Sequence, residues 1–87
     1  MIGKSDSFTA DNNSVYKINA DHDIIVTLPS ITSEDATLVF VNTGNHLFTL
    51  ALQGGNLING LASYPPNTGG YKVLSLASDN INSWIVL

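Results

Sequence analysis

The sequence predicts an all-β protein, a small antiparallel β-sandwich or barrel of about six to eight short strands. Short apolar or alternating segments recur along the chain, and turn-forming residues separate them about every eight to twelve residues, which is typical of sandwiches and barrels. No segment has the apolar period of about 3.6 residues that marks a convincing helix. The strongest single signal lies in residues 36–52, where two apolar runs flank the turn-forming segment 42–45 (NTGN) and predict a β-hairpin.

The amino-terminal residues 1–13 are mostly polar, and Phe8 is their one large aromatic anchor. This segment predicts either a first edge strand or an N-terminal arm, and an exposed arm would be the part that anchors the protein to a larger structure. We expect residues 14–87 to form a single β-sandwich domain, because the whole chain has 87 residues and domains usually have about 100–150.

Two strands are expected before the hairpin. Residues 15–20 alternate between apolar and polar side chains, which predicts a half-buried strand. The β-branched run 24–28 predicts the next strand, and Pro29 ends it because proline cannot donate a ladder hydrogen bond. Residues 32–35 (TSED) are a connector with the order of hydroxyl and acid that could open a single helical turn.

Both alternating faces of the predicted hairpin are apolar. In its first strand Leu38 and Phe40 point one way, whereas Val39 and Val41 point the other. A strand in a small antiparallel sheet normally has one wet face. We therefore expect a second apolar layer from another copy of the chain or from a larger partner, since a chain this short buries limited surface by itself.

Turn signals divide the rest of the chain into short pieces. Residues 53–56 and the Asn-Gly pair within 57–61 predict tight turns, the second of type I′. Residues 64–70 (YPPNTGG) predict an exposed loop, and residues 71–77 alternate as a strand does. The apolar residues 84–87 predict a closing strand at the centre of a sheet or at an interface, because an exposed one would invite aggregation. The side chains expected in the core are those of Phe40, Phe48, Leu50 and Trp84.

Composition excludes several classes of function. Charged residues make up 11% of the chain, against about 25% in an ordinary soluble domain, so much of the polar surface is expected to be Asn, Ser, Thr and Gly. The net charge is −4 with only three basic residues, which argues against nucleic acid because phosphate neutralisation needs several cations. No stretch approaches the roughly 20 apolar residues of a membrane span, and no signal peptide is evident. We expect neither nucleic acid nor membrane as a partner.

No catalytic or metal site is predicted. The chain has no cysteine, and no serine lies in a Gly-x-Ser-x-Gly elbow. The segment 21–23 (DHD) is interpreted as a solvated turn, because neighbouring residues on a strand point to opposite faces. Glu34 and Asp35 are interpreted as connector acids, and His46 would hold an ion only if three copies met around it. We therefore expect a protein that is not an enzyme and that uses no cofactor.

Five segments of the chain follow one another in a distinctive order. They are the strand that ends at Leu28-Pro29, then LVFVNTG (38–44), the GGNLING turn (54–60), the strand YKVLSLASD (71–79) and the closing NSWIV (82–86). In this order they resemble a small all-β module of bacteriophage virion proteins, over roughly residues 14–87. Such modules occur in tail fibres, in spikes and in small proteins that decorate the capsid, and they are commonly homotrimers with sheets packed around a threefold axis.

The resemblance implies a homotrimeric capsid decoration protein or short head fibre, made in the bacterial host cytoplasm and assembled onto the virion. The chain is shorter than a whole tail fibre, which favours the head. The expected partners are other copies of the chain and the phage major capsid protein or another virion protein. The residues expected in subunit contacts are Val39, Val41, Ile85 and Leu87.

Three aromatic residues support a different hypothesis. Tyr64, Tyr71 and Trp84, together with many asparagines, could form a sugar-binding platform, since rings stack on sugars and amides bond to hydroxyls. The protein would then be a receptor-binding tip module for host surface glycans, or a monomeric carbohydrate-binding module of a bacterial enzyme. The alternative is that Trp84 belongs to the core, where large aromatic side chains usually lie, and that Tyr64 flanks a loop.

Overall fold

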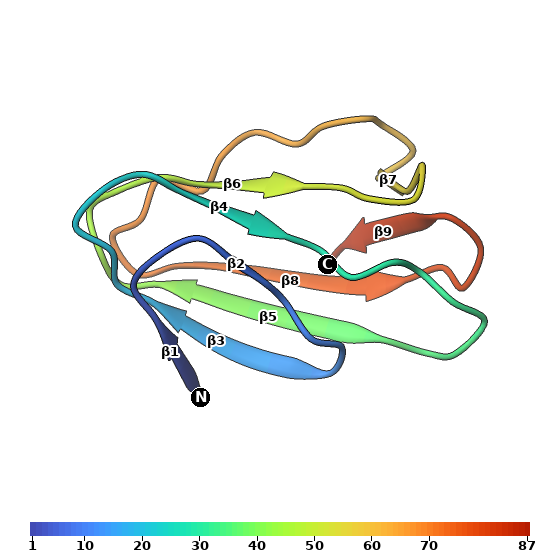
Figure 1. Ribbon diagram of the computed structural model, residues 1–87, viewed down its shortest axis with the longest axis horizontal. Helices are drawn as coiled ribbons and strands as arrows, with labels where there is room; N and C mark the ends of the chain where they lie inside the picture. The colour runs from blue at the N-terminus through green and yellow to red at the C-terminus, as the bar shows by residue number, and fades with distance from the viewer.

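Two β-sheets face each other in the computed structural model, which describes residues 1–87 and contains no helix (Figure 1). The larger sheet has six strands in the order β1-β3-β5-β8-β9-β7, and the smaller has three in the order β2-β4-β6. The predicted all-β sandwich is confirmed, with nine strands instead of six to eight. The strands are β1 (Ile2–Lys4), β2 (Phe8–Thr9), β3 (Ser14–Ile18), β4 (Ile24–Thr27), β5 (Thr37–Asn42), β6 (Phe48–Ala51), β7 (Leu57–Ile58), β8 (Lys72–Ser78) and β9 (Ser83–Val86).

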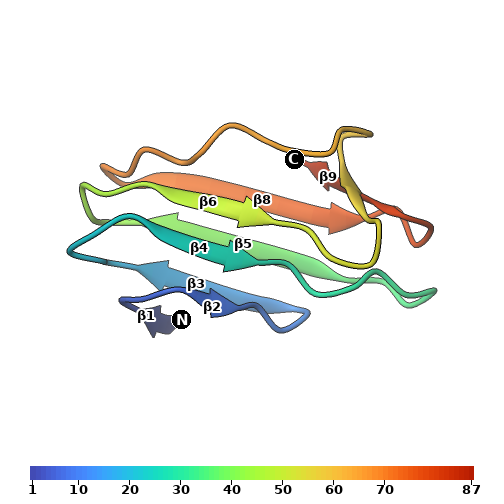
Figure 2. The same ribbon diagram turned by 45° about the horizontal axis from the view of Figure 1, so that its top comes forward.

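The first six strands form a stack of three coils, each with one strand in each sheet. We name them the first coil (β1 and β2), the second coil (β3 and β4) and the third coil (β5 and β6). Strands β1, β3 and β5 pair in parallel, and so do β2, β4 and β6. Figure 2 shows the coils lying one above another. The expected antiparallel architecture is therefore wrong for this half of the chain.

Residues 36–52 do not form the predicted hairpin. Strand β5 pairs with β3 and β8, whereas β6 pairs with β4 in the other sheet. The connecting residues 43–47 cross from one sheet to the other and form an arch. The side chain of Asn42, the last residue of β5, is buried at the start of this arch. Its Nδ2 donates to the His46 carbonyl (2.9 Å), and its Oδ1 accepts from the Gly44 N–H (3.2 Å). A turn-forming segment reverses the chain in a hairpin and in an arch alike, so the local pattern does not distinguish them.

The carboxyl-terminal strands end the parallel stack. Strand β8 runs antiparallel to β5, β9 runs antiparallel to β8, and β7 lies parallel to β9 at the edge. The predicted type I′ turn is confirmed, because Asn59 and Gly60 have φ values of 48° and 75° and the flanking Ile58 and Leu61 exchange two backbone hydrogen bonds. The predicted closing strand lies inside the large sheet, between β8 and β7.

The core lies between the two sheets. A row of aromatic rings crosses it, from Phe8 to Tyr16, Phe40 and Phe48, with neighbouring centroids 4.8–5.6 Å apart. The core predictions for Phe40, Phe48 and Trp84 are confirmed, because all three are essentially inaccessible to solvent. Leu50 is only half-buried and packs at the margin of the core.

Residues 1–13 are the first coil and not an extended arm. Strands β1 and β2 add to the edges of the two sheets, which agrees with the edge-strand alternative. Ala10 is buried, and the Asp11 N–H donates to the Tyr16 hydroxyl oxygen at 2.7 Å. The connector 32–35 contains no helical turn. Instead, the Glu34 N–H donates to the Thr32 hydroxyl at 3.2 Å.

Candidate functional site

The candidate interaction surface is the outer face of the six-stranded sheet, which points away from the core. Side chains on this face alternate along each strand with the buried ones. The outer face consists of Val15, Lys17, Thr37, Val39, Val41, Val73, Ser75, Ala77 and Ile85, and Leu87 follows next to Ser75 through a backbone hydrogen bond.

The register of the sheet places these apolar side chains side by side. Val15 lies beside Val39, and Val41 lies between Lys17 and Val73. Val15, Val73 and Ile85 are 40%, 59% and 44% exposed. Lys17 is the one ionisable side chain among them. The outer face is therefore largely apolar, with Lys17, Thr37 and Ser75 as its polar members, and exposed apolar patches often mark interaction sites in soluble proteins.

The four residues predicted for subunit contacts gather on this side of the molecule. Val39 and Val41 are half-buried in β5, Ile85 lies on β9, and Leu87 is 76% exposed just beyond it. Four neighbouring strands, β3, β5, β8 and β9, carry the apolar side chains. With strands about 4.8 Å apart and about five residues of 3.3 Å each, the face measures about 19 by 17 Å, or about 320 Å².

The three aromatic residues of the sugar-platform hypothesis do not come together on the surface. Trp84 is fully buried, because alternation along β9 turns it inward and Ile85 outward. Tyr64 is half-buried against the core. Only Tyr71 is widely exposed, at 76%, and its φ of 65° is unusual for a bulky residue. The prediction of Trp84 as a ligand-binding residue is therefore wrong, and its assignment to the core holds.

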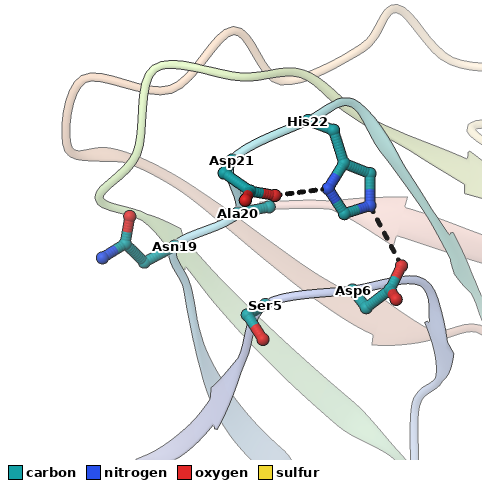
Figure 3. Close-up of a pocket in the computed structure, with 6 residues that line it drawn as sticks. All are labelled: Ser5, Asp6, Asn19, Ala20, Asp21 and His22. Atoms are coloured by element: carbon teal, nitrogen blue, oxygen red, sulfur yellow. Dashed lines mark hydrogen bonds and ion pairs between the residues drawn. The ribbon is translucent and has the colours of Figure 1, made fainter.

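A polar hollow lies at one end of the stack, between the arches of the first and second coils (Figure 3). The imidazole of His22 lies between two carboxylates there. Its Nδ1 is 2.6 Å from Asp21 Oδ1, and its Nε2 is 3.1 Å from Asp6 Oδ1. The other lining residues are Ser5, Asn19 and Ala20. The hollow thus holds a titratable cluster built from two different arches.

The carboxylates and the imidazole shift each other's pKa. The hydrogen bonds that the imidazole donates to Asp21 first and to Asp6 second raise the pKa of His22 above 6.5. The hydrogen bond with His22 lowers the pKa of Asp21, whereas the Ser7 N–H, followed by His22, lowers the pKa of Asp6. His22 is solvated as predicted, but its ring contacts the neighbouring Asp21. Its contact with Asp6 depends on the stacking of the first and second coils, which the sequence pattern did not indicate. No group of three or more His, Cys, Asp or Glu side chains is placed to hold a metal ion.

Comparison with known proteins gives no family assignment: no protein-family model matches the chain, and no curated protein sequence is significantly similar to it. The structure has no helix long and apolar enough to cross a membrane.

Proposed function

We propose that this protein is a structural subunit of a bacteriophage virion, a homotrimer that decorates the capsid or forms a short head fibre. The observation that carries the proposal is the apolar outer face, with Val15, Val73 and Ile85 exposed and Lys17 as its only ionisable side chain. A face of this kind would be covered in an assembly. The order of segments along the chain resembles that of phage virion modules, which are commonly homotrimers, and this resemblance is the reason for proposing a homotrimer in a virion.

The dimensions of the outer face suit three copies around a common axis. Three faces about 19 Å wide form a triangle whose sides lie about 5.5 Å from the axis, close to half of the roughly 10 Å between packed sheets.

The position of Lys17 is compatible with this packing. It lies on β3, beside Gly3 of the edge strand β1. In a trimer with strands along the axis, β3 would lie near a corner of the triangle, where an ammonium group can remain in water. The branched side chains of β5 and β8 would then face the axis and exclude water from it.

The trimer is tested by light scattering on the purified chain, repeated after dilution to sub-micromolar concentration. The expected mass is about 28 kDa, three times the 9.3 kDa of one chain. Val73→Asp should give 9.3 kDa particles, because it puts a carboxylate into the contact while Val73 is 59% exposed in the single chain and tolerates a polar group there. Thr49→Asp is the control, since Thr49 is exposed on the smaller sheet. A wild-type protein that stays monomeric at all concentrations contradicts the trimer.

The virion location needs a separate test. Phage particles from the source organism are purified on a density gradient and labelled with antibodies raised against the chain, and the label is located by electron microscopy. Label on heads supports a decoration protein or head fibre. Label on tails moves the proposal to a tail fibre, and particles without label contradict a virion role.

One observation favours the glycan-binding alternative. Tyr71 presents its ring to solvent from a left-handed backbone, and strained residues of this kind often belong to ligand sites. A receptor-binding role for this loop predicts binding on a glycan array that Tyr71→Ala abolishes. Substitution of Ile81, which is 80% exposed elsewhere, should leave such binding unchanged. Absence of binding to any glycan by the oligomeric protein contradicts this alternative.

A further inference from the structure

His22 connects the first coil to the second at the end of the stack where the polar hollow lies. Its ring touches Asp21 in its own arch and Asp6 in the arch between β1 and β2, as Figure 3 shows. We propose that this contact is a proton-operated clasp, which holds the first coil against the second while the imidazole is protonated and loosens when the imidazole loses a proton. The proposal is independent of any virion role.

The geometry itself calls for a doubly protonated ring. A neutral imidazole has one N–H donor and one bare nitrogen, whereas an ionised carboxylate can only accept hydrogen bonds. Both ring nitrogens of His22 face carboxylate oxygens, at 2.6 and 3.1 Å. Only the imidazolium can donate to both. After deprotonation, one of the two contacts places a lone pair against a carboxylate, and that contact becomes repulsive.

Lys4 and Lys17 do not line this hollow, but they line the neighbouring one, which shares Ser5 and Asn19 with it. Ser5, Asn19 and Ala20 complete the lining of the hollow, and all are uncharged. The remaining titratable groups of the arches are Asp23 and His46, which face each other at 3.6 Å. Asp23 also accepts the Leu47 N–H at 2.9 Å and so belongs to the contact between the second and third coils.

The raised pKa of His22 sets the direction of the pH effect. A folded-state pKa above 6.5 means that the contact contributes its full stabilisation below pH 6.5. The stabilisation is then lost as the pH rises through the folded-state pKa. The clasp is therefore closed below pH 6.5 and loosens as the pH rises through the folded-state pKa of His22.

The first coil is the part of the fold that such a contact can move. Strands β1 and β2 have three and two residues, and each pairs on one side only. His22 and Asp6 are largely exposed, so their contact is weak and biases local opening more than global unfolding. Opening of the first coil would uncover Tyr16, which is buried and packs against Phe8.

The test is amide hydrogen exchange of the full chain at pH 5.5 and pH 8.0, with each rate divided by the intrinsic rate at that pH. The reporters are the Ala10 N–H, bonded to the Thr27 carbonyl, and the Asn19 N–H, bonded to the Lys4 carbonyl. We expect the open fraction at both to be about threefold larger at pH 8.0, as for an exposed ion pair. The Ser78 N–H, bonded to the Ala36 carbonyl in the large sheet, is the internal reference and should not change.

Matched variants assign the effect to His22. His22→Gln and Asp6→Asn should each remove the pH dependence at the two reporters. Asp23→Asn changes a carboxylate on the same arch without touching His22 and should preserve that dependence. A nitrogen-15 titration of the imidazole provides a second readout, with both ring nitrogens protonated at pH 6 in the wild type. Equal open fractions at the two pH values, or an unchanged pH dependence in His22→Gln, would overturn the clasp.

Discussion

Gly69 lies directly against the backbone of Gly44. A Cβ atom on Gly69 would overlap the Gly44 carbonyl oxygen, and the backbone of Gly69 has a φ of +81°. The next residue, Gly70, donates its N–H to the same carbonyl oxygen at 2.8 Å. The long loop before β8 is therefore fastened to the arch of the third coil by two glycines, which explains why the turn-forming run ends in Gly-Gly.

Gly69→Ala should lower the free energy of unfolding by about 2–4 kcal/mol, because it adds a steric clash to an unfavourable backbone conformation. Gly70→Ala is the matched control. Gly70 has a φ of +72° but nothing within 4 Å of the added Cβ, so it should lose only about 1 kcal/mol. Urea denaturation of both variants measures the difference. Equal losses would show that the close approach to Gly44 is unimportant.

Asn42→Ala should destabilise the protein by about 2–3 kcal/mol, because it leaves the His46 carbonyl and the Gly44 N–H without their partner in a buried arch. Asn45→Ala, in the same arch but exposed and without a side-chain hydrogen bond, should change the stability by less than about 0.5 kcal/mol. Thermal unfolding followed by circular dichroism measures both. A small effect at Asn42 would contradict its role in closing the arch.

Asp79 should contribute to acid sensitivity. Its Oδ1 accepts the N–H groups of Ile81, Asn82 and Ser83 at 2.8–3.0 Å, and hydrogen bonds led by Ser83 and Ile81 lower the pKa of this carboxyl below 3.8. The stabilisation is therefore present above pH 3.8 and is lost as the pH falls through the folded-state pKa.

The stability advantage of the wild type over Asp79→Asn should accordingly shrink between pH 5 and pH 2.5, as measured by urea midpoints. The comparison variant Glu34→Gln removes a carboxylate that accepts no hydrogen bond. A pH-independent difference between the wild type and Asp79→Asn would show that ionisation of Asp79 does not support the turn.

Trp84→Phe should lower the free energy of unfolding by about 1 kcal/mol, whereas Trp84→Ala should lower it by about 3–5 kcal/mol. The reason is that the Trp84 Nε1–H is buried without a hydrogen-bond partner, so part of the gain from burying the indole is already lost. Urea denaturation followed by circular dichroism compares the two variants. A loss for Trp84→Phe as large as that for Trp84→Ala would mean that the indole nitrogen carries no penalty.

The alternation of apolar and polar residues predicted which way the side chains of a strand point. It could not predict which strands pair with each other. Leu38 and Phe40 point inward and Val39 and Val41 outward, as period two requires. The same rule, applied to residues 84–87, would have separated Trp84 from Ile85. The parallel partnership of Tyr16 with Phe40 is different, because it joins residues 24 positions apart and leaves no local mark.

The candidate sites follow the same division. The apolar outer face could be recognised from the sequence, because two-sided apolar alternation in β5 is a local property. The contact between His22 and Asp6 could not be recognised in this way, because the two residues lie 16 positions apart and only the stacking of parallel coils brings their arches together. The orientation of Tyr71 likewise depends on how its loop is fastened to the third coil.

The repeat between the second and third coils has a consequence for the evolution of size. Tyr16 pairs with Phe40 and Val26 with Leu50, so both sheets advance by one strand for the same 24 residues. Because β8 reverses direction and closes the stack separately, a duplicated 24-residue unit would lengthen both sheets by one strand, about 4.8 Å, and leave the closing strands as they are. A lineage could thus tune the height of this sandwich by copying one segment, with no redesign of either end.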